Sequence, residues 1–325
     1  MTTAQLLAKF KDLTALVIGD ICLDRWCTYD PAVSEPSRET GIPRLGVVST
    51  VVTPGAGGTV ANNLAALGAG RIAVLGMVGD DGFGYELRQA LTARGIEHFL
   101  LVNAPGRQTF TYTKLLNATN GEEDKPRIDF ISTDDIPSAV EDTLLHRLRE
   151  SWHVFDVILV SDQAETERGG VVTRRMRDLI AELAAERPDK IFWVDSRLRP
   201  EHFRGVIVKP NNHEAEAACR RAIGTVDYTR FRRHIAAPLL LVTHGSEGVL
   251  TIREGHEDVW VRTRPIANPV DICGAGDSFS AGASLALAVT GDPIQAAEFG
   301  NLVASITIMK KGTGTASPAE LLGTA

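Results

Sequence analysis

Short runs of β-branched and other apolar residues alternate along this chain with longer segments whose apolar residues recur at helical spacing. The short runs are typical of buried strands, and the longer segments are typical of helices that cover a core. The predicted strands are residues 14–18, 71–75, 96–102, 157–160, 191–194, 206–208 and 239–243. The predicted helices are residues 58–67, 85–94, 171–186, 212–222, 275–289 and 294–309. This alternation predicts an α/β fold, in which a parallel sheet is covered by helices on both faces.

Other segments alternate like strands but are not followed by helices, namely residues 45–53, 109–116 and 127–132. The first follows a stretch that contains Pro, Ser and Arg, and the other two flank an acidic loop. They do not fit the strand–helix–strand rhythm of a parallel sheet. We therefore expect a small β-sheet lid, inserted at about residues 24–53 and 108–132 of a single domain that spans residues 1–325.

The composition is that of a globular protein with a large core. Of the 325 residues, 44% are hydrophobic and 23% are charged, and 41 acidic against 34 basic residues give a net charge of -7. A nucleic-acid partner would require a basic face, and a membrane span would require about 18 apolar residues in a row, so neither partner is expected. The N-terminal residues lack the apolar stretch of a signal peptide, which favours a cytoplasmic location. The cysteines lack metal-type spacing and are expected to be reduced: Cys22, Cys27, Cys219 and Cys273.

The most informative motif is Asp271-Ile-Cys-Gly-Ala-Gly-Asp-Ser-Phe-Ser-Ala-Gly282, which opens a predicted helix. Gly274-Ala275-Gly276 places small residues where the backbone can come close to a ligand. The helix N-terminus behind them offers unpaired N–H groups and the positive end of the helix dipole, which suit an anion such as a phosphoryl group. Asp277 is then placed to accept a proton from an attacking hydroxyl. The alternative is that Asp277 only satisfies the helix N-terminus, where acidic residues are common.

A second glycine turn, which contains Gly57 and Gly58, opens another predicted helix, and Asn62 lies in about the first turn of that helix. The amide of Asn62 is able to hydrogen-bond a polyol. Asp20 and Asp24 are four residues apart, just past the first predicted strand. Because open α/β sheets bind ligands at the carboxyl ends of their strands, both carboxylates are candidate acceptors for sugar hydroxyls. The alternatives are a turn residue for Asp20 and a solvated charge for Asp24.

A third motif, Lys209-Pro-Asn-Asn-His-Glu214, follows the predicted strand at 206–208. Asn211 and Glu214 either form a capping box at the helix start or hold water around Mg²⁺, an ion that keeps much of its hydration. Lys209 would meet a phosphate as a point charge. Downstream, the predicted strand at 239–243 runs into a tight turn that ends at Gly248, and this turn is a candidate wall for a nucleotide.

Two common nucleotide-binding motifs are missing from the sequence. No Gly-Lys pair occurs, so there is no G-x-x-x-x-G-K-[ST] loop. Residues 55–60 lack the last glycine of G-x-G-x-x-G, which argues against a dinucleotide-dependent oxidoreductase. A nucleotide would therefore be held by a different kind of site.

Together these motifs resemble the ribokinase-like (PfkB) family of sugar kinases. The G-A-G-D within D-x-x-G-A-G-D-x-F-x-A-G is highly specific for that family, and G-G-x-x-x-N and K-P-N-x-x-E precede it in the expected order. The resemblance extends from Gly19 to Gly314. It implies a Rossmann-like α/β domain, a β-sheet lid and a site between them. It also implies transfer of the γ-phosphoryl group of ATP, with Mg²⁺, to a sugar.

The resemblance implies roles for individual residues. The catalytic base would be Asp277, and the anion hole would be the backbone of Gly274, Ala275 and Gly276. The sugar would be held by Asp20, Asp24, Gly57, Gly58 and Asn62. The nucleotide, with Mg²⁺ held through water by Asn211 and Glu214, would lie near Lys209, Asn211, Glu214, Thr243, Gly245, Gly248 and Asn301. The same analogy implies a homodimer formed through the lid and a monovalent cation such as K⁺ near Asp271 and Gly312.

Within the family, the chain is most similar to the kinases of ADP-heptose synthesis, which phosphorylate the anomeric oxygen of a heptose 7-phosphate. The similarity is carried by residues 19–26, 113–116, 127–130, 160–162 and 312–318. The chain differs from them after Asp162, where those kinases have a Tyr-Gly turn and this chain has Gln163-Ala164, and it also differs at residues 36–43. No nucleotidyltransferase segment follows, so we expect a kinase alone.

The sequence therefore predicts an ATP-dependent sugar kinase, with heptose 7-phosphate as one candidate acceptor. The alternatives are a kinase of a neutral sugar such as ribose or fructose, and a catalytically idle sugar or nucleotide sensor. Retention of Asp277 beside a complete anion hole argues against the sensor, which needs no base. An acceptor that already carries a phosphate would need a cation, for which the candidates are Arg38, Lys114 and Arg127. The alternative for these three is that they are solvated surface charges.

Overall fold

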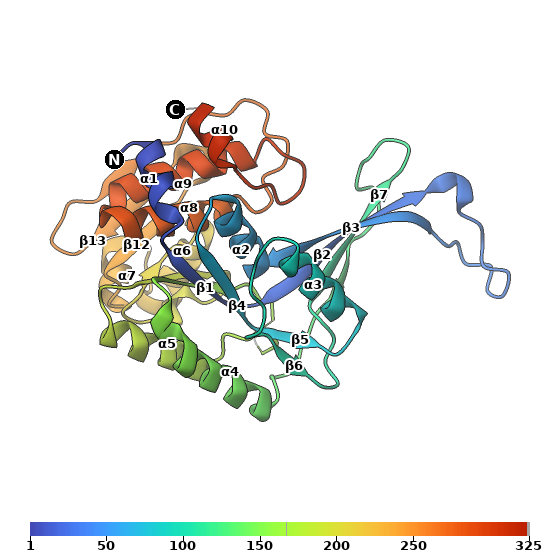
Figure 1. Ribbon diagram of the computed structural model, residues 1–325, viewed down its shortest axis with the longest axis horizontal. Coiled ribbons are helices and arrows are strands. Elements are labelled where there is room, and N and C mark those ends of the chain that lie inside the picture. The colour runs from blue at the N-terminus through green and yellow to red at the C-terminus, as the bar shows by residue number, and fades with distance from the viewer. Residues whose placement is uncertain (167, 324–325) are drawn as a thin grey trace.

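The computed structural model describes residues 1–166 and 168–323, and its centre is an eight-stranded sheet (Figure 1). Its strands run parallel from β4 to β12, and β13 and β14 continue antiparallel at one edge. The order across the sheet is β14 (Val259–Val261), β13 (Val249–Arg253), β12 (Leu239–Thr243), β11 (Ile207–Val208), β10 (Ile191–Ser196), β9 (Val157–Asp162), β1 (Thr14–Gly19) and β4 (Arg71–Leu75). The predicted α/β fold with a mostly parallel sheet is confirmed.

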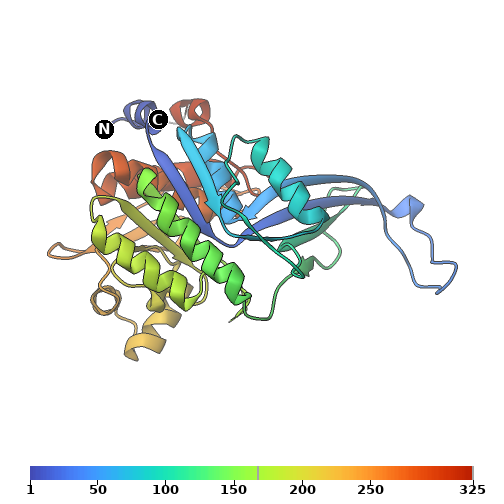
Figure 2. The same ribbon diagram turned by 60° about the horizontal axis from the view of Figure 1, so that its bottom comes forward.

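Helices cover both faces of this sheet because its central strands are apolar on both sides (Figures 1 and 2). In β1, Ala15 and Val17 join one hydrophobic cluster, whereas Leu16 and Ile18 join the other, as the alternation of side chains along a strand requires. The first cluster includes residues of α1 (Thr3–Phe10), α2 (Gly57–Ala66), α3 (Gly82–Thr92), α8 (Ala275–Thr290), α9 (Pro293–Thr307) and α10 (Pro318–Gly323). The second includes residues of α4 (Ser138–Ser151), α5 (Arg174–Glu186), α6 (Asn212–Ile223) and α7 (Tyr228–His234).

Close packing of α8 against α9 and the sheet places the start of α8 near the strand ends. A Cβ atom on Gly300 of α9 would lie 2.8 Å from the ring of Phe279 on α8, so this approach requires glycine. On the sheet side, the Ser280 hydroxyl of α8 lies 3.5 Å from the carboxylate of Asp195, near the end of β10. Helix α8 therefore begins at the carboxyl edge of the parallel strands, where open α/β sheets bind ligands.

A second, four-stranded sheet, which we call the lid sheet, extends from one side of the central sheet (Figure 1). Its order is β3 (Gly46–Ala56), β2 (Ile21–Asp30), β7 (Thr111–Asn117) and β8 (Ile128–Phe130). Only Asp20 separates β1 from β2, so the lid sheet is joined directly to the carboxyl edge of the central sheet. The segment between β2 and β3, residues 31–45, extends further in the same direction (Figures 1 and 2). The small β-sheet that the sequence predicted is present.

Most predicted strands and helices are found with bounds shifted by a few residues, but the strand at 96–102 is wrong. Residues 96–101 form turns with a single bridge, between Ala73 and Glu97, and β6 begins at Val102. Ile96, Leu100 and Leu101 are buried there without a strand partner, whereas Phe99 is 58% exposed, so the pattern reported burial of most of the segment and not strand geometry. The elements that the sequence did not predict include β2, β13, β14, α1, α4, α7 and the pair formed by β5 (Met77–Gly79) and β6 (Val102–Ala104). Within the described residues, no helix is both long enough and apolar enough to span a membrane.

Candidate active site

The turn before α8 forms a backbone cradle. Gly274 has φ 77°, a left-handed conformation that favours glycine, and no side chain caps the helix that follows. The backbone N–H groups of Gly276 and Asp277 have no hydrogen-bond partner within the described part of the chain. They lie at the positive end of the helix dipole. This cradle of residues 274–277 is therefore suited to an anion, as the glycine motif predicted.

A buried ion pair lies against the cradle. Lys209 Nζ is 2.5 Å from Asp195 Oδ2, and both side chains are almost fully buried. A Cβ atom on Gly276 would lie 3.1 Å from Lys209 Nζ, which places the ammonium group beside the cradle. Burial alone would lower the pKa of Lys209, but attraction to Asp195 and then to Glu214 outweighs it and raises that pKa. The lysine is thus held in its charged form. The sequence analysis missed Asp195, although a carboxylate at the end of a buried strand was visible there.

The carboxyl group of Asp277 has a pKa close to neutral pH. The side chain is half-buried in the first turn of α8. Its pKa is raised from 3.8 to about 7, first by burial and then by the neighbouring charge of Asp195, while Lys209 opposes the shift. A carboxyl group with this pKa can accept a proton near pH 7 and release it again. Asp277 therefore has the electrostatic properties of a general base.

Asn211 and Glu214 form a complete capping box at the start of α6. The Asn211 side chain accepts a hydrogen bond from the Glu214 N–H at 2.9 Å, and Glu214 Oε2 accepts one from the Asn211 N–H at 2.7 Å. The pKa of Glu214 is raised, first by burial and then by Asp195. The capping interpretation is thus observed, and one carboxylate oxygen is left for another ligand. The predicted role at Mg²⁺ stays a prediction, and the described residues contain no group of three or more His, Cys, Asp or Glu that could hold a metal ion.

The residues predicted near the nucleotide lie around the ends of β12 and β14. Thr243, the last residue of β12, donates from its backbone N–H to Pro210, and this contact brings it beside Asn211. Gly248 closes the turn with φ 109°, and a Cβ atom there would lie 2.2 Å from the Val261 carbonyl oxygen. The same oxygen accepts a hydrogen bond from Asn301 of α9. These residues therefore lie in one group. Gly245, whose φ is 54°, belongs to it because its carbonyl accepts a hydrogen bond from the Gly248 N–H.

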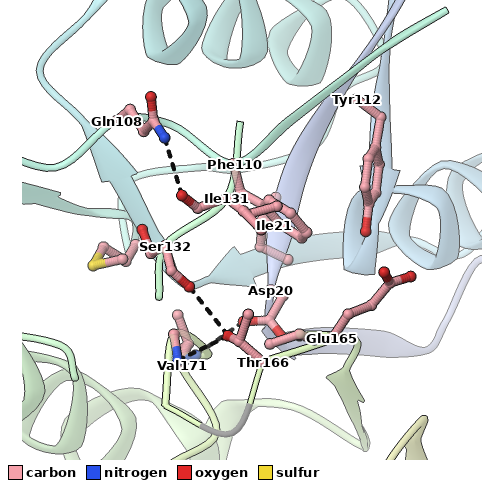
Figure 3. Close-up of a pocket in the computed structure, with 13 residues that line it drawn as sticks. Asp20, Ile21, Gln108, Phe110, Tyr112, Ile131, Ser132, Glu165, Thr166 and Val171 are labelled. Carbon is pink, nitrogen blue, oxygen red and sulfur yellow. Dashed lines mark hydrogen bonds between the residues drawn. The ribbon is translucent and has the colours of Figure 1, made fainter. Parts of the chain in front are cut away.

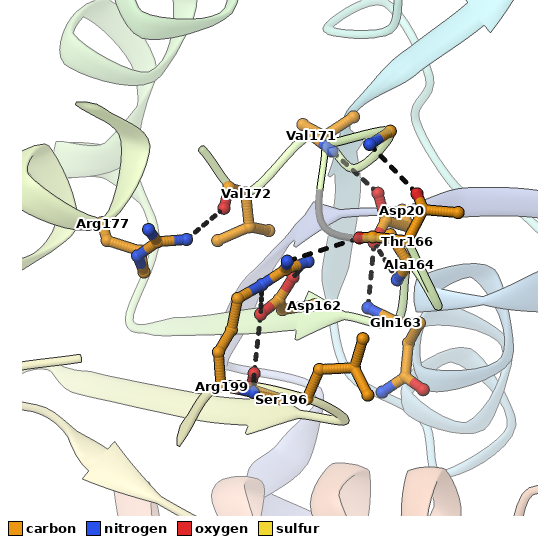
Figure 4. Close-up of polar contacts among 12 residues, drawn as sticks. Asp20, Asp162, Gln163, Ala164, Thr166, Val171, Val172, Arg177, Ser196 and Arg199 are labelled. Atoms are coloured by element: carbon orange, nitrogen blue, oxygen red, sulfur yellow. Dashed lines mark hydrogen bonds and ion pairs between the residues drawn. The ribbon is translucent and has the colours of Figure 1, made fainter. Parts of the chain in front are cut away.

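Asp20 is bound to the loop that follows β9. Its two carboxylate oxygens accept hydrogen bonds from the N–H groups of Gln163, Ala164 and Val171 at 2.8–2.9 Å (Figure 4). Burial raises the pKa of Asp20 to about 6, and the nearby Asp162 adds to the rise. Its observed role is to hold this loop against the end of β1. Contact with a sugar, which the sequence analysis expected, stays a prediction.

The same loop is held by a second buried carboxylate, Asp162. Arg199 contacts both of its oxygens at 2.9 and 3.0 Å, and the Ser196 hydroxyl donates to it at 2.6 Å (Figure 4). The Arg199 guanidinium also donates to the Thr166 carbonyl at 3.4 Å. Charge-assisted hydrogen bonds in this forked geometry are strong and directional. The described residues of the loop after β9 are thus held at several points, although they form no helix or strand.

Asp24 lies on β2 of the lid sheet and not in a turn. Burial raises its pKa to about 6, and Lys114 and then Arg127 of the lid oppose the rise. A Cβ atom on Gly55 would lie 2.3 Å from Asp24 Oδ1, so the adjacent strand must carry glycine. The neighbouring Cys22 thiol has a pKa raised by burial and then by Asp24, Asp20 and Asp277. The charges of the three predicted site carboxylates therefore all act on this one thiol.

The glycine turn before α2 lies against Asp20. The Gly57 N–H donates to the Asp20 carbonyl at 2.9 Å, and a Cβ atom on Gly57 would lie 2.7 Å from Ile21. A Cβ atom on Gly58 would lie 2.6 Å from Pro54, so both positions need glycine for this close packing. Asn62, one turn into α2, is half-buried. Sugar contacts by these three residues stay predictions.

The residues of the predicted monovalent-cation site are adjacent in the structure. Asp271 Oδ2 accepts a hydrogen bond from the Gly312 N–H at 3.0 Å, and Asp271 Oδ1 accepts one from the Cys273 N–H at 2.9 Å. The carboxylate thus ties the segment before the cradle to the segment after α9. The predicted cation itself stays a prediction.

A small cavity separates the loop after β9 from the lid sheet. Its volume is about 40 Å³, and it lies beside Asp20 (Figure 3). The lid side contributes Phe110 and Tyr112, and the loop side contributes Glu165 and Thr166. A cavity of this volume holds no more than small groups or water. The sequence analysis did not identify Tyr112 or Glu165, because neither belongs to a recognisable motif.

Comparison with known proteins agrees with this geometry. The family described as pfkB family carbohydrate kinase matches residues 16–125 and 205–320. The chain is 33% identical over 335 residues to bifunctional protein HldE of Geobacter metallireducens, an alignment that covers 98% of this chain and 64% of that protein. A protein of the same name from Geotalea uraniireducens is 32% identical over 326 residues, again with 98% and 64% coverage. The chain thus spans 64% of the length of these relatives.

Solved structures share the fold at low sequence identity. Phosphofructokinase-2 from Escherichia coli, in complex with potassium, has a TM-score of 0.70 at 18% identity, over 96% of this chain and 97% of that one. Ribokinase from Arabidopsis thaliana, complexed with ribose and ATP, has a TM-score of 0.66 at 15% identity, over 96% and 98%. These structures establish the ribokinase-like fold, and the family match covers more than half of the chain. The chain therefore belongs to the pfkB family of carbohydrate kinases.

Proposed function

We propose that this carbohydrate kinase transfers the γ-phosphoryl group of Mg-ATP to a hydroxyl of a phosphorylated sugar, with a heptose 7-phosphate as the favoured acceptor. The observation that carries the proposal is the position of Asp277. A carboxyl group with a pKa of about 7 stands in the first turn of α8, next to unpaired backbone N–H groups and to the charged Lys209. A base, an anion cradle and a cation in contact are the parts that phosphoryl transfer needs.

In the proposed mechanism, Asp277 accepts the proton of the acceptor hydroxyl as the oxygen attacks the γ-phosphorus. The N–H groups of Gly276 and Asp277 then donate to the oxygens of the transferring group, whose charge is spread during transfer. Lys209, held by Asp195, supplies a fixed positive charge beside the cradle. Mg²⁺ would neutralise the ATP phosphates when bound, and the free oxygen of Glu214 with the Asn211 amide would hold it through water.

Support for a heptose acceptor comes from resemblance to the kinases of ADP-heptose synthesis and from the lid cations. Lys114 and Arg127 lower the pKa of Asp24, so both charges lie near the expected sugar site. Arg38 is exposed in the segment between β2 and β3, which extends away from the central sheet (Figure 1). Lys114 and Arg127 are therefore better candidates than Arg38 for a phosphate bound within one chain. The replacement of a Tyr-Gly turn by Gln163-Ala164 leaves the identity of the sugar to experiment.

The proposed kinase also acts as a homodimer formed through the lid sheet. Strand β3 is the edge strand of that sheet. Val47, Val48 and Val51 on it are 47%, 57% and 61% exposed. An apolar edge strand of this kind invites pairing with another strand.

K⁺ near Asp271 and Gly312 is a second part of the proposal, supported by their direct hydrogen bond, and is tested by assaying with and without K⁺.

The first prediction concerns the acceptor. Purified protein with Mg-ATP is expected to release ADP rapidly with heptose 7-phosphate, and much more slowly with fructose 6-phosphate, ribose, fructose, adenosine or no acceptor. The measurement is a coupled ADP assay across this panel. Turnover with ribose or fructose instead would retain the kinase and overturn the heptose assignment, and ATP binding without any turnover would favour the sensor.

The second prediction concerns the base. Asp277→Asn removes the proton acceptor and keeps the backbone cradle, so kcat should fall by roughly 10²–10⁴-fold while ATP affinity is kept. Turnover and calorimetric ATP binding measure the two effects. The matched control is Asp189→Asn, which removes an exposed carboxylate paired with Arg187 and should leave kcat unchanged. Near-normal kcat in Asp277→Asn would contradict the assignment.

The third prediction is a pH profile. A base must be deprotonated to act, so kcat/KM should rise with pH through the pKa of Asp277, about 7, and reach a plateau above it. Asp195→Asn removes a negative charge that raises this pKa, so it should move the rising limb to lower pH. The profile is measured under subsaturating acceptor in buffers of constant ionic strength. A limb that does not move in folded Asp195→Asn would show that another group titrates.

The fourth prediction concerns assembly. Val51→Lys places a charge in the middle of the exposed edge strand, and it should convert a dimer to a monomer in sedimentation velocity. Val259→Lys, at a valine 40% exposed on β14, is the control that should stay dimeric. A wild-type protein that sediments as a monomer under assay conditions would refute the lid dimer.

A further inference from the structure

Glu165, which lines the cavity between lid and loop, interacts with arginines from two different parts of the fold. Arg197 directly follows β10, after Ser196, and Arg127 directly precedes β8 of the lid sheet. Arg197 Nη1 lies 3.5 Å from Glu165 Oε1. Glu165 also raises the pKa of Arg127, after the larger effect of Asp129. One carboxylate therefore interacts with a cation from the central sheet and with a cation from the lid.

The contact between Arg197 and Glu165 is loose. The two side chains are 51% and 47% exposed, and their closest approach is longer than an ordinary charge-assisted hydrogen bond. The backbone of Arg197 is nonetheless fixed, because its N–H donates to the Asp162 carbonyl at 3.0 Å. The backbone of Arg197 is thus fixed, whereas its guanidinium group is held only weakly. Exposed pairs of this kind contribute little, so another anion can replace the carboxylate.

Arg127 stacks on Tyr112, which lines the same cavity from the lid. Its guanidinium lies 4.4 Å from the centre of the Tyr112 ring, and it pairs with Asp129 at 2.7 Å. Tyr112 and Glu165 line the cavity together, and Figure 3 shows the Tyr112 hydroxyl and the Glu165 carboxylate on the same side of it. Stacking on Tyr112 holds the plane of the arginine, and Asp129 occupies only part of its N–H groups, so a phosphate would bind beside Asp129. Two residues that line the cavity therefore each contact an arginine: Tyr112 contacts Arg127, and Glu165 contacts Arg197.

Both arginines also lie near the carboxylates of the site. The pKa of Asp277 is raised first by burial, and Arg197 is among the charges that oppose the rise. The pKa of Asp24 is likewise raised by burial and opposed by Lys114 and Arg127. An acceptor that presents a hydroxyl to Asp277 and is held by Asp24 would thus bind in the positive field of both guanidinium groups.

We propose that Arg197 and Arg127 bind the phosphate monoester of the acceptor, and that Glu165 occupies Arg197 until the phosphate displaces it. The inference rests on the proposed sugar-kinase function and assigns the residues that select a phosphorylated acceptor. A phosphate dianion offers three oxygens to two planar forks, so it binds them more strongly than one carboxylate does. When no acceptor is bound, Glu165 occupies Arg197. Any anion must displace this carboxylate, which lowers the affinity of the site for the wrong anions.

The test uses two substitutions with opposite expected effects. Arg197→Gln should raise the Kd for heptose 7-phosphate roughly 10- to 100-fold, the usual effect of losing a charged hydrogen-bond partner. Glu165→Gln should lower that Kd about two- to fivefold, because the competing carboxylate is gone. Calorimetry without nucleotide measures both effects, and inorganic phosphate serves as a second probe. In the kinase assay, Arg197→Gln should raise the acceptor KM and leave the ATP KM and kcat within a few-fold.

Matched controls come from exposed pairs elsewhere on the surface. Arg187→Gln and Glu182→Gln alter side chains that are both 49% exposed, and neither should change the Kd. Arg197→Lys should give an intermediate Kd, because it keeps the charge and loses the fork. Equal effects of Arg197→Gln on phosphorylated and neutral sugars, or a rise in the ATP KM alone, would overturn the proposal. So would a Kd that rises in Glu165→Gln.

The outcomes separate this inference from the proposed function. Binding of heptose 7-phosphate with the expected variant pattern, but without turnover, would support the phosphate site and contradict the kinase reaction. Turnover of a neutral sugar by a wild-type protein that binds no phosphate ester would overturn the phosphate site and leave a sugar kinase. Binding and turnover that both follow the expected pattern would support both.

Discussion

The ion pair between Lys209 and Asp195 is the interaction on which the rest of the site depends. Its two residues come from adjacent parallel strands, whose register pairs Val194 with Val208, and the Lys209 N–H continues the ladder by donating to the Val194 carbonyl. The next residue of each strand therefore carries one charge of the pair. Because both charges are buried, loss of either partner alone would leave the other uncompensated, at a typical cost of about 3–5 kcal/mol.

This pair also determines the properties of its neighbours. Lys209 lies so close to Gly276 that a side chain there would have to move the ammonium group. Burial raises the pKa of Asp277 most, Asp195 adds to the rise and Lys209 opposes it, so the ion pair modulates how readily Asp277 accepts a proton. The same two charges act on Glu214. The cradle, the base and the capping box are therefore electrostatically coupled through two side chains at the ends of β10 and β11.

The parts of the site that the sequence predicted are those made of contiguous residues. The cradle and Asp277 lie within one motif. The close packing around them requires glycines, and those glycines belong to the same short stretch of sequence. Asp195 could not be predicted as the partner of Lys209, because their contact depends on which strands are neighbours and in what register. Glu165 and Arg197 were missed for the same reason, since their contact joins a loop after β9 to the end of β10. Asn211 shows a different limit, because one pattern fits both the observed helix cap and the predicted ligand set for Mg²⁺.

The fold prediction succeeded where burial and periodicity agree, and it failed where they diverge. The continuous apolar runs of β1, β9, β10 and β12 can only be satisfied in a sheet that is covered on both faces. The lid strands β3, β7 and β8 were recognisable because they break that pattern, whereas β2 was not predicted. The run at 96–102 is apolar enough for a strand, yet only Glu97 finds a backbone partner on β4. Hydrophobicity thus reports that a segment is buried, whereas hydrogen-bonding partners decide its geometry.

The lid sheet and the cradle are connected by one short segment after α9. A Cβ atom on Gly312 would lie 3.1 Å from the Trp26 ring of β2, and a Cβ atom on Gly274 would lie 3.3 Å from Thr313. The Lys311 ammonium group, in addition, donates to a carbonyl in the loop after β7. Consecutive residues therefore contact the lid on one side and the cradle on the other. The lid cannot swing away as a rigid sheet without breaking the contact at Gly312, so its position and the geometry around Gly274 are mechanically linked.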